Sequence, residues 1–136
     1  MPGRLAIALL LLTACSSRPS PKKAEKERER AASDAASAGM IAAAWDSGAA
    51  PGIYASHALR RISADFSQSE QAPVWSALPP AARRALTTEL GRLHSVTAGI
   101  DSAIGRRDHI AVRALHRALA VHGYALAAVP IDTASR

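Results

Sequence analysis

Apolar residues recur at steps of three and four in four separate stretches of this chain, and this spacing favours helices throughout. Residues at these steps lie on one face of an α-helix, whereas a half-buried strand needs strict alternation. No alternating run bounded by turn residues is present. The four stripes are Ala31, Ala35, Ala38, Ala42 and Trp45; Ala55, Leu59, Ile62 and Phe66; Leu86, Leu90, Leu93, Thr97, Ile100 and Ile104; and Val112, Leu115, Leu119, His122 and Leu126.

Turn and cap residues divide these stripes into four helices. Pro51-Gly52 separates the first two, and Pro79-Pro80 opens the third, because proline is tolerated in a first helical turn. We expect helices over about 24–45, 53–68, 80–104 and 109–122, with Gly105 just past the third, Asp108 as the N-cap of the fourth and Gly123 at its end. Residues 69–78 are expected to form a loop in which Val74, Trp75 and Leu78 cover one end of the core.

Four helices with short connections predict a small all-α protein with up-down bundle topology. The alternative is a three-helix bundle that begins at Ile53, with residues 24–45 as a helical stalk. In both arrangements Gly91 and Gly99 are expected to mark close packing between helices.

The first fifteen residues have the organisation of a secretory signal. Arg4 precedes an apolar run from Leu5 to Leu12, far shorter than the roughly 20 residues of a membrane-spanning helix. Leu12-Thr13-Ala14-Cys15 follows directly and resembles the lipobox of bacterial lipoproteins. The resemblance implies cleavage before Cys15, diacylglycerol on its thiol and a further acyl chain such as palmitate on its amino group. Because Cys15 is the only cysteine, no disulfide within the chain is expected.

The same resemblance predicts a location. Serine after the acylated cysteine of Gram-negative lipoproteins usually permits export, so Ser16 favours the periplasmic face of the outer membrane. We therefore expect residues 1–14 to be a removed signal peptide, 15–30 an acylated cysteine and basic tether, 31–129 the helical domain and 130–136 a loose tail.

The net charge of +6 is unevenly distributed. Residues 16–30 hold six basic and three acidic residues, a net of +3, whereas residues 31–136 hold ten arginines and eight acidic residues, a net of +2. Basic residues beside a lipid anchor can add attraction to anionic headgroups, although the run can also be a solvated helix start. Nucleic acid is not an expected partner, because no aromatic residues accompany the basic ones.

One basic helix face is a candidate site for an anionic polymer or an acidic protein, because arginine binds phosphate and carboxylate groups through two hydrogen bonds. The alternative is a solvated outer face. The candidate residues are Arg106, Arg107, His109, Arg113, His116 and Arg117.

Motifs of catalysis and of cofactor binding are absent from the sequence. No two histidines are three or four residues apart, and the sequence has no Glu-x-x-His, C-x-x-C-H, G-x-S-x-G or glycine-rich phosphate loop. We therefore expect no catalysis, no metal and no cofactor. The one exception considered is Met40 with His122, since a methionine of the first helix and a histidine of the last bind haem in cytochromes that resemble b-type four-helix bundles.

These patterns together predict a lipid-anchored lipoprotein of the cell envelope. We expect it to be a non-catalytic interaction or structural module that docks an envelope protein or an anionic envelope component through a helix face. The alternative is a periplasmic carrier of a ligand or cofactor bound between helices.

Overall fold

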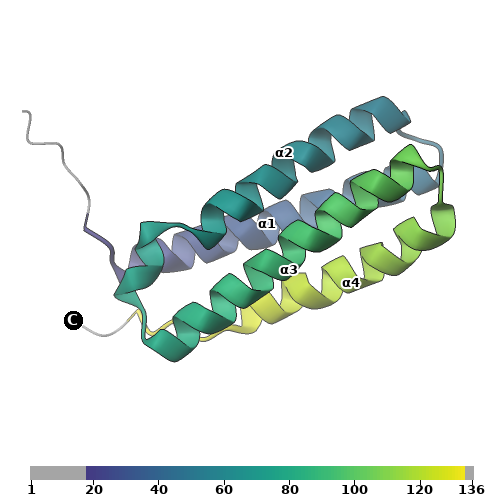
Figure 1. Ribbon diagram of the computed structural model, residues 1–136. Helices are drawn as coiled ribbons and strands as arrows, with labels where there is room; N and C mark the ends of the chain where they lie inside the picture. The colour runs from purple at the N-terminus through teal and green to yellow at the C-terminus, as the bar shows by residue number, and fades with distance from the viewer. Residues whose placement is uncertain (1–17, 134–136) are drawn as a thin grey trace, which may run out of the picture.

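The computed structural model describes residues 18–133, which form four α-helices and one short 3-10 helix in an up-down bundle (Figure 1). The elements are α1 (Pro21–Asp46), α2 (Gly52–Glu70), η1 (Pro73–Ala77), α3 (Pro80–Gly105) and α4 (His109–Ala128). Helix α1 packs against both α2 and α4. The all-α four-helix prediction is confirmed, and the alternative of a separate helical stalk is wrong.

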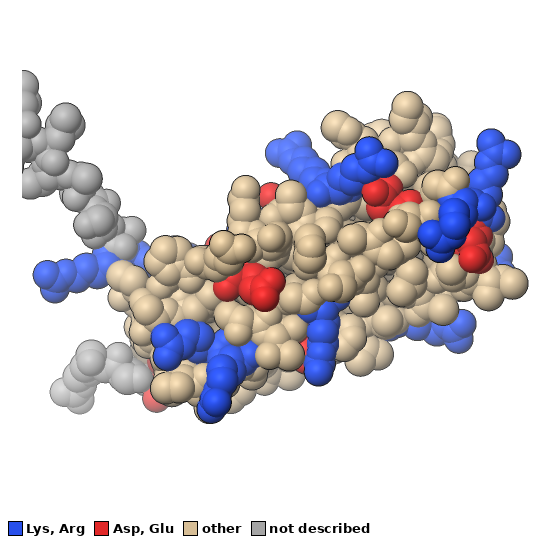
Figure 2. All heavy atoms as spheres, in the orientation of Figure 1, with Lys and Arg blue, Asp and Glu red and all other residues tan. Residues whose placement is uncertain are grey.

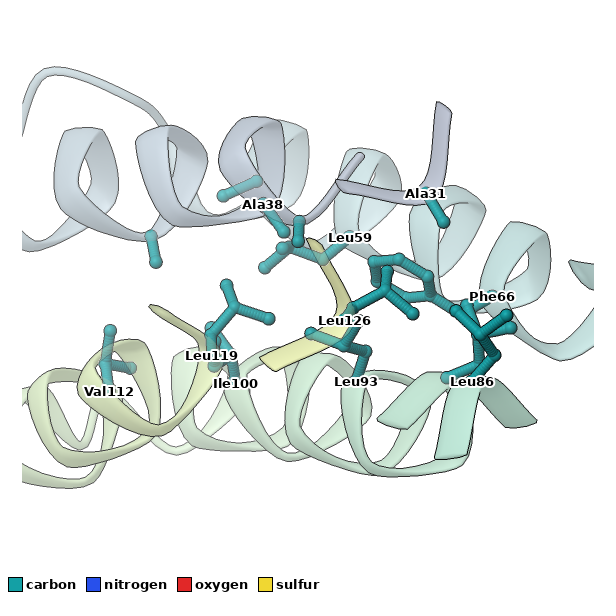
Figure 3. Packing of buried hydrophobic residues seen from close by; sticks show 14 of the residues in the cluster. Ala31, Ala38, Leu59, Phe66, Leu86, Leu93, Ile100, Val112, Leu119 and Leu126 are labelled. Carbon is teal, nitrogen blue, oxygen red and sulfur yellow. The ribbon is translucent and has the colours of Figure 1, made fainter. Parts of the chain in front are cut away.

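The apolar stripes form the core. Every residue of the first and third stripes is buried, and Leu59, Phe66, Leu119 and Leu126 meet them from α2 and α4 (Figure 3). In the second stripe Ile62 is only partly buried and the neighbouring Ser63 is buried instead. The charged side chains lie outside this core, with basic and acidic ones interspersed over the face shown in Figure 2.

The segment between α2 and α3 closes one end of the core, as its apolar residues predict. Trp75 and Leu78 are buried, and Val74 packs partly against them. The indole Nε1 of Trp75 donates a hydrogen bond of 2.6 Å to the carbonyl oxygen of Ser69. This bond satisfies the one polar group of a side chain that is 2% exposed.

Helix α1 begins within the segment expected to be a tether, so the boundary at residue 30 is wrong. Pro21 occupies the first turn and Ser20 is the N-cap, accepting a hydrogen bond from the backbone N–H of Lys23. Ala24 is fully buried. Glu27 accepts a hydrogen bond from Ser69 of α2, so the first turns of α1 belong to the folded bundle.

The chain after α4 also departs from the prediction of a loose tail. Val129 is buried, and Ile131 packs partly against the core. Arg28 of α1 donates a hydrogen bond to the carbonyl oxygen of Val129. Of the predicted tail, Ile131 is therefore packed and Pro130, Asp132 and Thr133 are exposed, while 134–136 lie outside the described residues.

Two predicted helix ends are wrong. Helix α3 includes Gly105, which was expected just past its end, and the left-handed residue that follows the helix is Arg107, which has φ +55°. Asp108 caps α4 as predicted, with its carboxylate accepting from Ala111 N at 2.9 Å. Helix α4 continues past Gly123 to Ala128, and Gly123 lies against α1, where an added Cβ would be 3.4 Å from the Cβ of Ala35.

The two glycines inside α3 do mark close packing, as predicted. A Cβ at Gly91 would lie 3.2 Å from Glu70 Oε1, and one at Gly99 would lie 3.3 Å from Leu115 Cδ1.

Candidate functional site

An open groove of about 440 Å³ lies between α1 and α4 on the outside of the bundle. Its walls are almost wholly carbon, and two of its apolar side chains are strongly exposed, Met40 at 74% and Tyr124 at 78%. Helix α1 contributes Ala32, Ala35, Ala36, Gly39, Met40 and Ala43, and α4 contributes His116, Leu119, Ala120, Gly123, Tyr124 and Ala127.

Small residues on α1 create this groove. Ala32, Ala36, Gly39 and Ala43 again step by four and three, beside the stripe that faces the core. The imidazole of His116 lies across Gly39, where an added Cβ would be 3.2 Å from Nε2. The sequence carried this signal as a second stripe of small residues, which our prediction of a single buried stripe did not use.

An acidic residue of α1 occupies part of the predicted anion-binding face. Asp46 accepts hydrogen bonds from His109 Nδ1 at 2.7 Å and Arg113 Nε at 2.8 Å. The guanidinium of Arg113, followed by the imidazole of His109, holds the pKa of Asp46 below its usual value. His109 also stacks on Trp45, with the ring centroids 4.3 Å apart. These contacts fasten the end of α1 to α4.

The other four residues of the predicted face divide between two places. His116 lines the groove, and Arg117 lies one position along α4, where its Nε donates only to the carbonyl oxygen of Arg113, at 3.4 Å. Arg106 and Arg107 instead occupy the connection between α3 and α4 and are exposed. The predicted face is therefore not one surface, and its α4 part continues into the apolar groove.

Met40 and His122 do not converge on a common site. Met40 lines the α1–α4 groove, whereas His122 Nδ1 lies 2.8 Å from Glu89 Oε2 on α3. Glu89 in turn accepts a hydrogen bond of 2.8 Å from Arg92. The imidazole of His122 thus has a carboxylate partner on the opposite side of α4 from Met40.

A polar cleft between α2 and α3 contains a histidine that our sequence reasoning did not select. His94 Nδ1 lies 2.9 Å from the carbonyl oxygen of Ser63 and 3.0 Å from its hydroxyl. Because a carbonyl can only accept, Nδ1 must carry the hydrogen in the neutral ring. This nitrogen therefore cannot take a proton from the Ser63 hydroxyl, and the pair lacks the geometry of an activated nucleophile.

Within residues 18–133, no three His, Cys, Asp or Glu side chains form a group that could bind a metal ion. In the same part of the chain, no helix is both long enough and apolar enough to span a membrane. Cys15, the predicted acylation site, lies outside the described residues. No protein-family model, curated protein or solved structure matches the chain.

Proposed function

We propose that this chain is a lipid-anchored lipoprotein of the cell envelope whose bundle docks another envelope protein, without catalysis, in the α1–α4 groove. The observation that carries the proposal is the groove itself: an open apolar surface with two large exposed side chains. Contiguous exposed apolar surface of this kind is typical of interaction sites. The anchor would be acylated Cys15, at the periplasmic face of the outer membrane.

The shape and charge of the groove favour a helix as its occupant. Alanine and glycine walls let a further helix approach α1 and α4 closely, in the way that the core stripe of alanines lets those two approach each other. At one end of the groove Arg117 has no carboxylate partner among residues 18–133, and His116 lies beside it. We infer that the partner offers an apolar helix face with an acidic residue at the matching end.

The start of α1 fits a short anchor. Pro21 lies six positions after Cys15, and six residue steps span at most about 21 Å when fully extended. The lysines at 22, 23 and 26 would then lie near lipid headgroups, which they attract if these are anionic. Two or more acyl chains would hold the bundle stably at that surface.

The carrier alternative has less support. It needs Met40 and His122 on one site, and they lie on different sides of α4.

A crosslinking experiment in the intact envelope tests the docking. A photoreactive phenylalanine analogue replaces Ala120 in the groove or, as a matched control, Ala85, an exposed alanine on α3. We expect one protein adduct from position 120 and none from 85, with the adduct weakened by Arg117→Glu. Equal adducts from both positions, or none from 120, would contradict the proposal.

The anchor is tested separately by the mass of the protein extracted from its own envelope in mild detergent. A mass equal to the chain from Cys15 onward plus acyl groups is expected. The mass of an uncleaved or unacylated chain would refute the lipoprotein assignment and leave the docking experiment standing.

A further inference from the structure

The end of the bundle farthest from the start of α1 exposes three large apolar side chains. Ile53 is 85% exposed, Ile110 is 80% exposed and Tyr54 is 64% exposed. Ile53 and Tyr54 lie in the first turn of α2, and Ile110 lies in the first turn of α4. Figure 1 places both turns at the end opposite Pro21, beside the connections 47–51 and 106–108. We call this end the distal tip.

The distal tip also carries positive charge that the bundle does not neutralise. Three carboxylates lie at this end: Asp46 bonds His109 and Arg113, Asp101 pairs with Arg60 at 2.9 Å, and Asp108 caps α4. The four arginines at this end, Arg60, Arg106, Arg107 and Arg113, outnumber these three acidic residues. Arg106 and Arg107 are exposed and form no ion pair with any residue between 18 and 133. Figure 2 shows several basic side chains at this end of the molecule, with acidic ones among them.

One cleft joins the apolar and the basic parts of the distal tip. A cleft of about 480 Å³ between the two connections is lined by Ile53, Arg107 and His109, with Trp45 among its walls. Arg107 lines it from a left-handed conformation, φ +55°, which is uncommon for a residue with a side chain. The guanidinium of Arg107 and the side chain of Ile53 therefore border the same cleft. The other two exposed apolar residues are next to cleft residues in the sequence: Tyr54 follows Ile53, and Ile110 follows His109.

We propose that the distal tip binds the surface of an anionic lipid bilayer. The isoleucines and Tyr54 enter the boundary between headgroups and acyl chains, and Arg106 and Arg107 bind lipid phosphates. A specific protein interface usually buries about 800 Å² on each partner. A bilayer needs only a few projecting apolar side chains with cations beside them, which is what the distal tip offers. This binding is independent of docking in the α1–α4 groove.

The bundle is long enough to hold the distal tip well away from the membrane that carries the lipid anchor. Helix α1 has 26 residues and therefore extends about 39 Å. A chain anchored at Cys15 would carry the distal tip roughly that far from its own membrane, so the two ends can contact two bilayers.

A vesicle-bridging experiment tests the proposal. The chain from Cys15 to Arg136 is coupled through its only thiol to a maleimide lipid in neutral phosphatidylcholine vesicles, so that native acylation is not needed. These vesicles are mixed with others that contain phosphatidylglycerol, and clustering is followed by light scattering. Coupling at Cys15 keeps the lysines of α1 at the first vesicle, which leaves the distal tip to contact the second.

We expect clustering with phosphatidylglycerol vesicles, none with pure phosphatidylcholine vesicles, and inhibition by salt. The double variant Ile53→Ser, Ile110→Ser should weaken binding by at least about tenfold, because each buried isoleucine contributes on that scale. Arg106→Ser with Arg107→Gly should weaken it about fivefold per arginine, and glycine suits the positive φ at 107.

The matched control is Met40→Ser with Tyr124→Ser, which removes equally exposed apolar side chains from the groove and should leave clustering unchanged. Circular dichroism checks that all variants fold. Clustering that survives the isoleucine variant, or falls equally in the control, would overturn the proposal. So would a photoreactive residue at position 54 that captures a protein rather than lipid in the native envelope.

Discussion

Replacing Thr97 by valine should stabilise the protein. Thr97 lies in the core stripe of α3 with no exposed surface, and its hydroxyl has no hydrogen-bond partner within residues 18–133. A buried polar group without a partner costs about 1–3 kcal/mol. Valine has nearly the same shape and replaces the hydroxyl by a methyl group, which suits contact with the surrounding leucines and isoleucines. We expect the free energy of unfolding to rise by about 1–2 kcal/mol.

Urea denaturation measures this change as a higher midpoint with an unaltered slope. For a domain of this size, 1 kcal/mol corresponds to a rise of about 4 °C in Tm. Thr87→Val on the same helix is the matched control, because the Thr87 hydroxyl lies at the surface and donates to the carbonyl oxygen of Arg83 at 3.0 Å. That variant should lose about 0.5 kcal/mol. If Thr97→Val is no more stable than the natural chain, the buried hydroxyl has a partner and the reasoning is refuted.

Three further substitutions, the first with a control variant, test the packing, the charge and the turn geometry by the same denaturation measurement. Leu119→Ala should cost about 2–5 kcal/mol because it empties a buried position of α4, whereas Val121→Ala, at an exposed position of that helix, should cost under about 0.5 kcal/mol. Lys22→Glu should raise the free energy of unfolding by about 0.3–1 kcal/mol, because the first turn of α1 holds no acidic residue to interact with the helix dipole. A lower free energy of unfolding would contradict this electrostatic argument. Arg107→Gly should gain up to about 1 kcal/mol by relieving the left-handed conformation, and no gain would mean that contacts of Arg107 compensate for it.

The core residues could be predicted because apolar residues at helical spacing lie on the face of the helix that is buried. The residues from Leu86 to Ile104 in the third stripe are buried because their spacing places them on one face of α3, which packs against the other helices. Asp108 was predictable as a cap because it bonds a backbone N–H only three residues away. The start of α1 was not predictable in this way. Its first turns are held by Ser69 and Val129, which lie 42 and 101 residues from their partners.

The candidate surfaces were only partly predictable for a related reason. Spacing shows which residues share a face of one helix, but the groove depends on how α1 and α4 lie against each other. The predicted basic face does not form one surface, because Asp46 of α1 binds two of its residues, His109 and Arg113. Arg106 and Arg107 lie apart from it because they belong to the connection between α3 and α4 rather than to helix α4.

Helix α1 packs along its length through small residues and is tied at its two ends by carboxylates, so we expect it to be the most acid-sensitive helix of the bundle. Its central core stripe is alanine, which buries little apolar surface compared with the leucines of α3. Near its start, Glu27 binds Arg30 and Ser69, and hydrogen bonding by Arg30 is the largest cause of the lowered pKa of Glu27. At its last residue, Asp46 binds Arg113 and His109.

Both carboxylates have a lowered pKa in the folded state, so their contribution is complete above the pKa of the unfolded chain, about 4. It is lost as the pH falls through their folded values. Amide hydrogen exchange measured from pH 6 towards pH 3, after correction for intrinsic rates, should therefore show α1 losing protection before α3. In the double variant Glu27→Gln, Asp46→Asn, α1 should already exchange faster at pH 6 and change little on acidification. Uniform loss of protection over all four helices would instead mean that α1 is held by its alanine contacts as firmly as α3 is held by its leucines.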